Sequence, residues 1–167
     1  FTGNPNCGKT TLFNAYTGAG KKTANWPGVT VELSEGSLMH RGRPVRLVDT
    51  PGIYSLDPYT MEETVTRQCI RDQKADVIIH VADALLLERS LFLTMQLLAE
   101  GKPLVLALNM MDLVRERGMD IDTEGLSRLL GGIPVIPVSA RRRTGLEELM
   151  DAAVEAARAR RTADGSG

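Results

Sequence analysis

An eight-residue segment near the start of the chain constrains the fold more than any other feature. Residues 3–10 read Gly-Asn-Pro-Asn-Cys-Gly-Lys-Thr and match the phosphate-binding pattern G-x-x-x-x-G-K-[ST] without a gap. Glycines let successive backbone N–H groups face one anion, because a Cβ would forbid the necessary conformations. Lys9 can supply charge to the β- and γ-phosphates, and the Thr10 hydroxyl can bind Mg²⁺. Such a loop joins a buried strand to a helix, so the segment predicts an α/β domain.

Apolar periodicity along the rest of the chain agrees with this fold class. Helical spacing predicts helices at residues 9–16, 61–71, 88–100, 123–130 and 145–161. Strand patterns predict a hairpin of 29–39 with 44–48, buried strands at 77–81, 103–108 and 135–138, and loops at 21–28 and 49–59. Alternating strands and helices predict three layers: a mostly parallel six-stranded sheet with one antiparallel edge strand, and helices on both faces.

The length of 167 residues suits one domain, which we place at residues 1–161, with a disordered Gly/Ser tail at 162–167. Only two residues precede the phosphate loop, so we expect that most of the first strand is missing and that the chain is trimmed at its N-terminus. Twenty basic residues against 21 acidic ones give no reason to expect nucleic-acid binding. We interpret the arginine runs at 141–143 and 158–161 as solvated charge.

Asp49 begins an Asp-Thr-Pro-Gly segment at the end of a predicted strand. Its carboxylate can reach the shell of a bound Mg²⁺, and the Gly52 N–H can approach the γ-phosphate because no side chain blocks it. In isolation these residues would suit an ordinary turn at a strand end. Downstream of a phosphate loop, we favour the functional interpretation.

A second polar segment follows the strand at 103–108. Asp112 can accept two parallel hydrogen bonds from the N1–H and amino group of guanine, which adenine cannot offer. Asn109 can tie this loop to the phosphate loop, and Met110 can cover the base where many GTPases have lysine. Ser139 and Ala140, after the last strand, can present backbone N–H groups to the guanine carbonyl.

Together these segments resemble the small GTP-binding domains of the Ras-like superfamily, and within it the cytosolic G domain of the FeoB family of bacterial ferrous-iron transporters. The resemblance is carried by residues 3–11, 25–32 (Asn-Trp-Pro-Gly-Val-Thr-Val-Glu), 49–56, 88–91 and 109–112. It implies the Ras-like P-loop NTPase fold. It also implies that Thr30, with Gly28 and Val29, forms a first switch closing on Mg²⁺ and the γ-phosphate, and that residues 49 to about 60 form the second switch.

The resemblance also implies a role for Asn6. Potassium-activated GTPases have asparagine at this place, and its carbonyl coordinates K⁺ together with backbone carbonyls that would lie near Asn25 and Trp26. Ras-like enzymes place a water-orienting glutamine where this chain has Ile53, so we expect slow hydrolysis. The alternative for Asn6 is that it only favours a tight turn.

We therefore expect a Mg²⁺-dependent GTPase domain that regulates a FeoB-like transporter in the cytoplasm, at the inner face of the bacterial plasma membrane. Its expected partners are guanine nucleotide and the helical and transmembrane regions of the parent transporter, with a homo-oligomer left open. Expected catalytic residues are Asn6, Lys9, Thr30 and Gly52. Expected metal ligands are Thr10, Thr30 and Asp49 for Mg²⁺, and Asn6 for K⁺. Expected nucleotide contacts are Gly3, Asn4, Pro5, Asn6, Cys7, Gly8, Lys9, Thr10, Thr11, Gly28, Val29, Thr30, Asp49, Gly52, Asn109, Met110, Asp112, Ser139 and Ala140.

Two further interpretations stay open at this point. One is a soluble GTPase of the Era or tRNA-modification type, and the other is a GTP/GDP-sensing module with negligible turnover. An ATPase is disfavoured by Asp112. We interpret His40 as a solvated turn residue and His80 as a core histidine, and the sequence contains no His/Cys cluster with the spacing of metal ligands.

Overall fold

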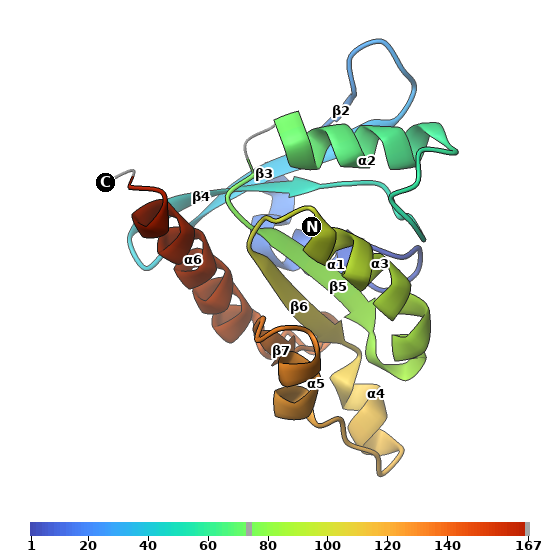
Figure 1. Ribbon diagram of the computed structural model, residues 1–167, viewed down its shortest axis with the longest axis vertical. Helices are drawn as coiled ribbons and strands as arrows, with labels where there is room; N and C mark the ends of the chain where they lie inside the picture. The colour runs from blue at the N-terminus through green and yellow to red at the C-terminus, as the bar shows by residue number, and fades with distance from the viewer. Residues whose placement is uncertain (73–74, 166–167) are drawn as a thin grey trace.

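Two apolar segments form the centre of the structure, a computed structural model that describes residues 1–72 and 75–165. β5 (Ile78–Asp83) and β6 (Leu104–Asn109) are buried almost throughout and pair in parallel. β1 (Thr2–Gly3) lies beside β5, and β7 (Val135–Pro137) lies beside β6, giving a parallel sheet in the order β1-β5-β6-β7 (Figure 1). Strands covered on both faces carry continuous apolar runs, which is why the sequence predicts them.

A second, antiparallel sheet has the order β2-β3-β4. β3 (Glu32–His40) and β4 (Arg43–Asp49) form the predicted hairpin around a turn in which Arg41 and Gly42 have φ values of 48° and 76°. β2 (Lys22–Asn25) corrects the prediction of a loop at residues 21–28. All four of its residues are exposed, so there is no apolar alternation to detect, and it is held by backbone pairing to β3.

The mixed α/β class is confirmed, but the strands are arranged differently from the single six-stranded sheet predicted. The structure has one sheet of four strands and one of three. Two backbone hydrogen bonds bridge them, from Phe1 N to Val48 O at 2.7 Å and from Thr50 N to Phe1 O at 3.1 Å. The bridge between the sheets is short because β1 itself pairs through only two residues.

Helices cover both faces of the parallel sheet, as predicted. Five of them lie where the sequence predicts: α1 (Lys9–Thr17), α2 (Met61–Asp72), α3 (Leu87–Ala99), α5 (Thr123–Leu129) and α6 (Leu146–Ala163). A sixth, α4 (Met111–Glu116), was not predicted, and short 3₁₀ turns occur at η1 (Gly18–Gly20) and η2 (Ala84–Leu86). α1 and α6 share one core with alternate residues of β5 and β6, while α3 and α4 pack on the opposite face.

The C-terminal helix is longer than expected. α6 continues to Ala163 and so includes the first two residues of the predicted tail at 162–167, whose last two residues lie outside the described ranges. Within residues 1–72 and 75–165, no helix has the length and apolar character needed to cross a bilayer.

Candidate functional site

The phosphate loop occupies the turn between β1 and α1 at the carboxyl end of the parallel sheet. Gly8 caps α1 with φ 83°, and a Cβ there would lie 2.2 Å from Asn109 Nδ2. A Cβ on Gly3 would lie 2.4 Å from the Val81 carbonyl oxygen. Both positions therefore need glycine because the neighbouring atoms leave no room. Cys7 between them is buried and packs in the core cluster of α1 and β5, and this burial raises the pKa of its thiol.

Lys9 and Asp49 form a buried ion pair beneath this loop, with side chains 6% and 9% exposed. The Lys9 ammonium donates to the Asp49 carboxylate and to the Thr50 carbonyl. The Thr10 hydroxyl donates to the other carboxylate oxygen of Asp49 at 3.3 Å. A lysine charge, a hydroxyl and a carboxylate therefore meet beside the phosphate loop. Hard oxygen donors of this kind suit Mg²⁺.

The segment after Asp49 packs closely against the phosphate loop. A Cβ on Gly52 would lie 3.0 Å from the Pro5 Cα, and the Ile53 N–H donates to the Gly3 carbonyl at 3.0 Å. The Ile53 side chain is 3% exposed and belongs to the core cluster of Leu93 and the β5 and β6 strands. The residue that stands in the glutamine position thus faces the core and offers no polar group.

Thr30 is not brought to the other Mg²⁺ candidates. It is exposed and lies in the loop 26–31, which joins β2 to β3 and projects past α2 (Figure 1). Hydrogen bonds from Trp26 N to Val31 O at 2.8 Å and from Val29 N to Trp26 O at 3.2 Å close this loop on itself. Gly28 has φ 84° at its turn. In the described part of the chain, no hydrogen bond joins Thr30 to the phosphate loop.

Asn6 is exposed and has φ 63°, a left-handed conformation that asparagine tolerates better than most residues. Among the described residues its carboxamide has no hydrogen bond, so its oxygen is available to a ligand. The segment expected to complete a K⁺ site is held elsewhere, since Asn25 pairs with Glu32 in the β2–β3 ladder.

The base-binding candidates converge at the carboxyl ends of β6 and β7. Asn109 Nδ2 donates to the Cys7 carbonyl at 3.0 Å, and its Oδ1 accepts the Ala140 N–H at 3.0 Å. The Asn109 carboxamide therefore joins the phosphate loop to the loop after β7, as the sequence suggests. Met110 caps α4 with φ 67°, and its Cε lies 3.7 Å from the Cβ position of Gly8, at the edge of the phosphate loop.

Asp112 follows in the first turn of α4, and its side chain is 10% exposed. Burial raises the pKa of its carboxyl, but the Ser139 hydroxyl, nearby backbone N–H groups and the charge of Arg141 outweigh burial, so the pKa lies below its ordinary value. The carboxylate is thus ionised at neutral pH and can accept from two donors.

Sequence reasoning missed one contact of the phosphate loop. Asn4 Nδ2 donates to the Arg89 carbonyl of α3 at 3.2 Å, and the Arg89 guanidinium lies 5.7 Å from the ring centre of Tyr54. The segment 88–91 therefore touches both the phosphate loop and the predicted second switch. Its residues carry no phosphate-binding pattern of their own, so only the resemblance marks them.

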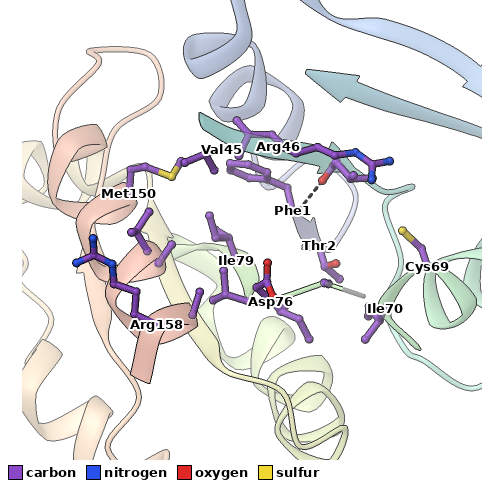
Figure 2. A pocket seen from close by; sticks show the side chains of 18 of the residues that line it. Phe1, Thr2, Val45, Arg46, Cys69, Ile70, Asp76, Ile79, Met150 and Arg158 are labelled. Atoms are coloured by element: carbon purple, nitrogen blue, oxygen red, sulfur yellow. Dashed lines mark hydrogen bonds between the residues drawn. The ribbon is translucent and has the colours of Figure 1, made fainter. Parts of the chain in front are cut away.

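A cavity of about 380 Å³ lies apart from these residues. It opens between β4, β5 and α6 beside Phe1, with Val45, Ile79 and Met150 among its apolar lining (Figure 2). None of residues 4–10 lines it, so it is not the candidate nucleotide site.

Known proteins are similar to this chain in sequence over most of its length. The family model described as ferrous iron transport protein B matches residues 1–153. The Fe(2+) transporter FeoB of Legionella pneumophila (strain Paris) is 48% identical over 151 residues, covering 88% of this chain and 20% of the transporter. That of Salmonella typhimurium is 46% identical and is covered to 19%. The chain thus spans about a fifth of the length of these relatives.

Solved structures of FeoB domains are similar to this chain as well. The cytosolic domain of the T. maritima FeoB iron transporter in a GDP form has a TM-score of 0.90 and 43% identity, covering 93% of this chain and 61% of that one. A mutant of S. thermophilus NFeoB bound to GDP has a TM-score of 0.86 and 42% identity, with 93% and 63% covered.

Proposed function

The chain belongs to the FeoB family as its P-loop GTPase domain, and from this premise we propose that it binds guanine nucleotide with Mg²⁺ and hydrolyses GTP slowly. The structures of relatives bound to GDP support the nucleotide class. The family match favours this proposal over a soluble GTPase of the Era or tRNA-modification type.

One observation supports the proposal most directly. The single carboxamide of Asn109 contacts both Cys7 in the phosphate loop and Ala140 in the loop after β7. Because these hydrogen bonds hold the two loops side by side, a nucleotide with its phosphates on the first loop would bring its base to the second. Asp112 would then accept the two parallel donors of guanine.

At the phosphate end, Lys9 would turn from Asp49 toward the β- and γ-phosphates, with Thr10 and Asp49 left to hold Mg²⁺. The metal would neutralise charge that develops on the transferred phosphoryl group. Thr30 would have to leave its closed loop to join this group, since residues 26–31 are hydrogen-bonded among themselves. That movement would be the first switch, and Gly52 beside Pro5 would belong to the second.

We further propose that a K⁺ ion bound at Asn6 acts as the cation that assists catalysis. The Asn6 carboxamide is exposed and without a hydrogen bond in the described chain, so its oxygen is open to a cation, whereas Ile53 is buried in the core and supplies no water-orienting group. A monovalent cation between the phosphates can stabilise the charge of the transition state.

The test measures GTP hydrolysis in KCl and in NaCl at equal ionic strength. Asn6→Gly removes the side chain and keeps the left-handed backbone free of strain, which alanine would not. We expect K⁺ to stimulate the unaltered chain, and Asn6→Gly to lose the stimulation while it still binds GDP. No turnover in either salt would instead support a binding module whose GTP or GDP state, and not its turnover, is read by a partner.

In the whole protein, we propose that this domain regulates ferrous-iron transport from the cytoplasmic face of the bacterial plasma membrane. The chain spans 20% of the Legionella pneumophila transporter, and the helical and transmembrane regions of its own parent transporter would be its partners. Iron uptake by a full-length protein with Asp112→Ala, which should impair guanine recognition, would test the link.

A further inference from the structure

One oxygen of the proposed guanine-recognising carboxylate is buried without a hydrogen bond. Asp112 Oδ2 has almost no accessible surface and no hydrogen-bond partner among the described residues. Two guanidinium groups lie next to it, Arg142 Nε at 3.5 Å and Arg141 Nε at 3.7 Å. Its surroundings are therefore cationic, and no hydrogen bond among the described residues uses its lone pairs.

Arg142 is held from two sides. Its Nη2 donates to Glu116 Oε1 at 2.9 Å, on the same helix as Asp112 and one turn later. Its backbone N–H donates to Ser139 Oγ at 3.1 Å, in the loop after β7. Arg142 therefore joins α4 to the loop that presents Ser139 and Ala140, although its side chain is 55% exposed, and that of Arg141 is 68% exposed.

The loop that carries Arg142 is itself fixed. Ser139 and Thr144 exchange two backbone hydrogen bonds of 3.1 Å, and Arg143, with φ 57°, donates to the Ala15 carbonyl of α1 at 3.1 Å. The arginine run at 141–143 is exposed, in agreement with its interpretation as solvated charge, and its side chains also contact α1 and α4. Each of its three side chains contacts a named group.

We propose that Arg142 is a positioning residue that orients the Asp112 carboxylate and thereby sets the preference of the site for guanine over bases that lack the amino group. The proposal rests on the proposed function, in which Asp112 binds guanine. Two parallel hydrogen bonds require the plane of the carboxylate to match the plane of the base. A guanidinium held beside Asp112 by Glu116, on a backbone anchored at Ser139, would restrict that plane.

The geometry argues against the opposite effect, in which Arg142 competes with the base. At 3.5 Å its Nε does not form a hydrogen bond with Asp112, and its Nη2 is already bound to Glu116. The guanidinium therefore does not form the bidentate pair with the Asp112 carboxylate that would block the base.

Affinities for GDP and IDP distinguish these cases, because IDP lacks the amino group and can use only one of the two hydrogen bonds. We expect Arg142→Ala to weaken GDP binding and to lower the ratio of GDP to IDP affinity by roughly three- to tenfold, an effect of about 1 kcal/mol. Glu116→Ala, which releases the Arg142 fork, should lower the ratio in the same direction. Arg115→Ala removes an exposed arginine from the same helix and should leave it unchanged.

Asp112→Ala separates this inference from the proposed function. If Asp112→Ala retains guanine preference, the proposed role of Asp112 fails, and the inference fails with it. In a second outcome, Asp112→Ala loses the preference, but Arg142→Ala weakens the binding of GDP and IDP by the same factor. Only the inference is then overturned, because Arg142 contributes charge without orienting the carboxylate. Tighter GDP binding by Arg142→Ala would show competition and also overturn it.

Discussion

The carboxamide nitrogen of Asn109 donates a 3.0 Å hydrogen bond to the carbonyl of Cys7, which lies 102 positions earlier in the chain. Both residues are almost fully buried, at 3% and 2% exposure. The other end of the same carboxamide accepts from Ala140. A single side chain thus fixes the spacing of three segments at the carboxyl end of the sheet.

Replacing Asn109 with alanine should weaken nucleotide binding and also destabilise the free protein. The change leaves the Cys7 carbonyl and the Ala140 N–H buried without partners, and each such group costs about 1–3 kcal/mol. Urea unfolding would measure the loss of stability, and titration with a fluorescent GDP would measure affinity. Asn14→Ala is the control, because Asn14 contacts only the exposed Lys21 ammonium through its side chain in the described structure. Equal effects of the two changes would contradict the bridging role.

Much of this arrangement could be predicted from local sequence. The phosphate loop requires particular residues at fixed spacing, and β5 and β6 are apolar because both their faces are covered. The polar residues Asp49 and Asn109 end strands, so their meeting at one edge follows from the parallel topology. The bridge from Asn109 to Cys7 follows from that topology as well.

Other features could not be predicted because their causes are not local. β2 has four exposed residues and exists because β3 offers a pairing edge. The side chain of His40, expected in solvent, is 11% exposed, and its Nε2 donates to the Asp151 carboxylate of α6 at 2.6 Å. Arg142 gains its partners only when α4 and the loop after β7 come together. The contacts of charged residues in turns depend on the tertiary structure and cannot be predicted from the local sequence.

Replacing Lys9 with methionine should destabilise the nucleotide-free protein as well as reduce GTP binding. The ammonium is the buried counter-charge of Asp49, and removal of one member of a buried pair costs about 3–5 kcal/mol. Adding Asp49→Asn should recover part of the lost stability, because it removes the uncompensated carboxylate. Chemical unfolding without nucleotide measures both variants. A double variant no more stable than Lys9→Met would contradict the interpretation.

Trp26, the one tryptophan of the chain, should report movement of the first switch. It is half-buried and lines a cavity with Leu33 and Cys69. Its backbone N–H donates to the Val31 carbonyl and holds the loop closed. If Thr30 moves to Mg²⁺ and the γ-phosphate, this hydrogen bond must break. We expect the emission maximum to shift with a non-hydrolysable GTP analogue and to stay constant with GDP. Thr30→Ala should abolish the difference; a shift that persists in this variant would exclude Thr30 as its cause.

Introducing the glutamine of Ras-like enzymes, Ile53→Gln, should not accelerate hydrolysis. The Ile53 side chain packs in the core, so glutamine would either bury an amide without a partner or disturb the turn beside Gly3. We expect a loss of stability of about 1–3 kcal/mol and a turnover no faster than before. Ile53→Val, which only shortens the side chain, is the matched control. Faster turnover in Ile53→Gln would show that the side chain can reach the nucleotide.

Stability should fall in mild acid because of His80. The Thr94 hydroxyl donates to the Ser90 carbonyl at 2.9 Å, so it accepts from His80 Nδ1 at 3.1 Å, which leaves Nε2 as a buried lone pair without a partner among the described residues. Burial lowers the pKa of His80 from 6.5 to about 3.

Because the folded pKa lies below the unfolded one, the unfolded chain takes up a proton first as the pH falls. This contribution to stability is therefore complete above pH 6.5 and declines toward pH 3, by about 1.4 kcal/mol per pH unit once well below 6.5. His80→Asn retains a donor for Thr94 and does not titrate. Urea midpoints at about pH 7.5 and about pH 5.0 should differ by less in His80→Asn than in the unaltered chain. If both proteins lose the same amount of stability in acid, the loss comes from other titrating groups, and the role of His80 is contradicted.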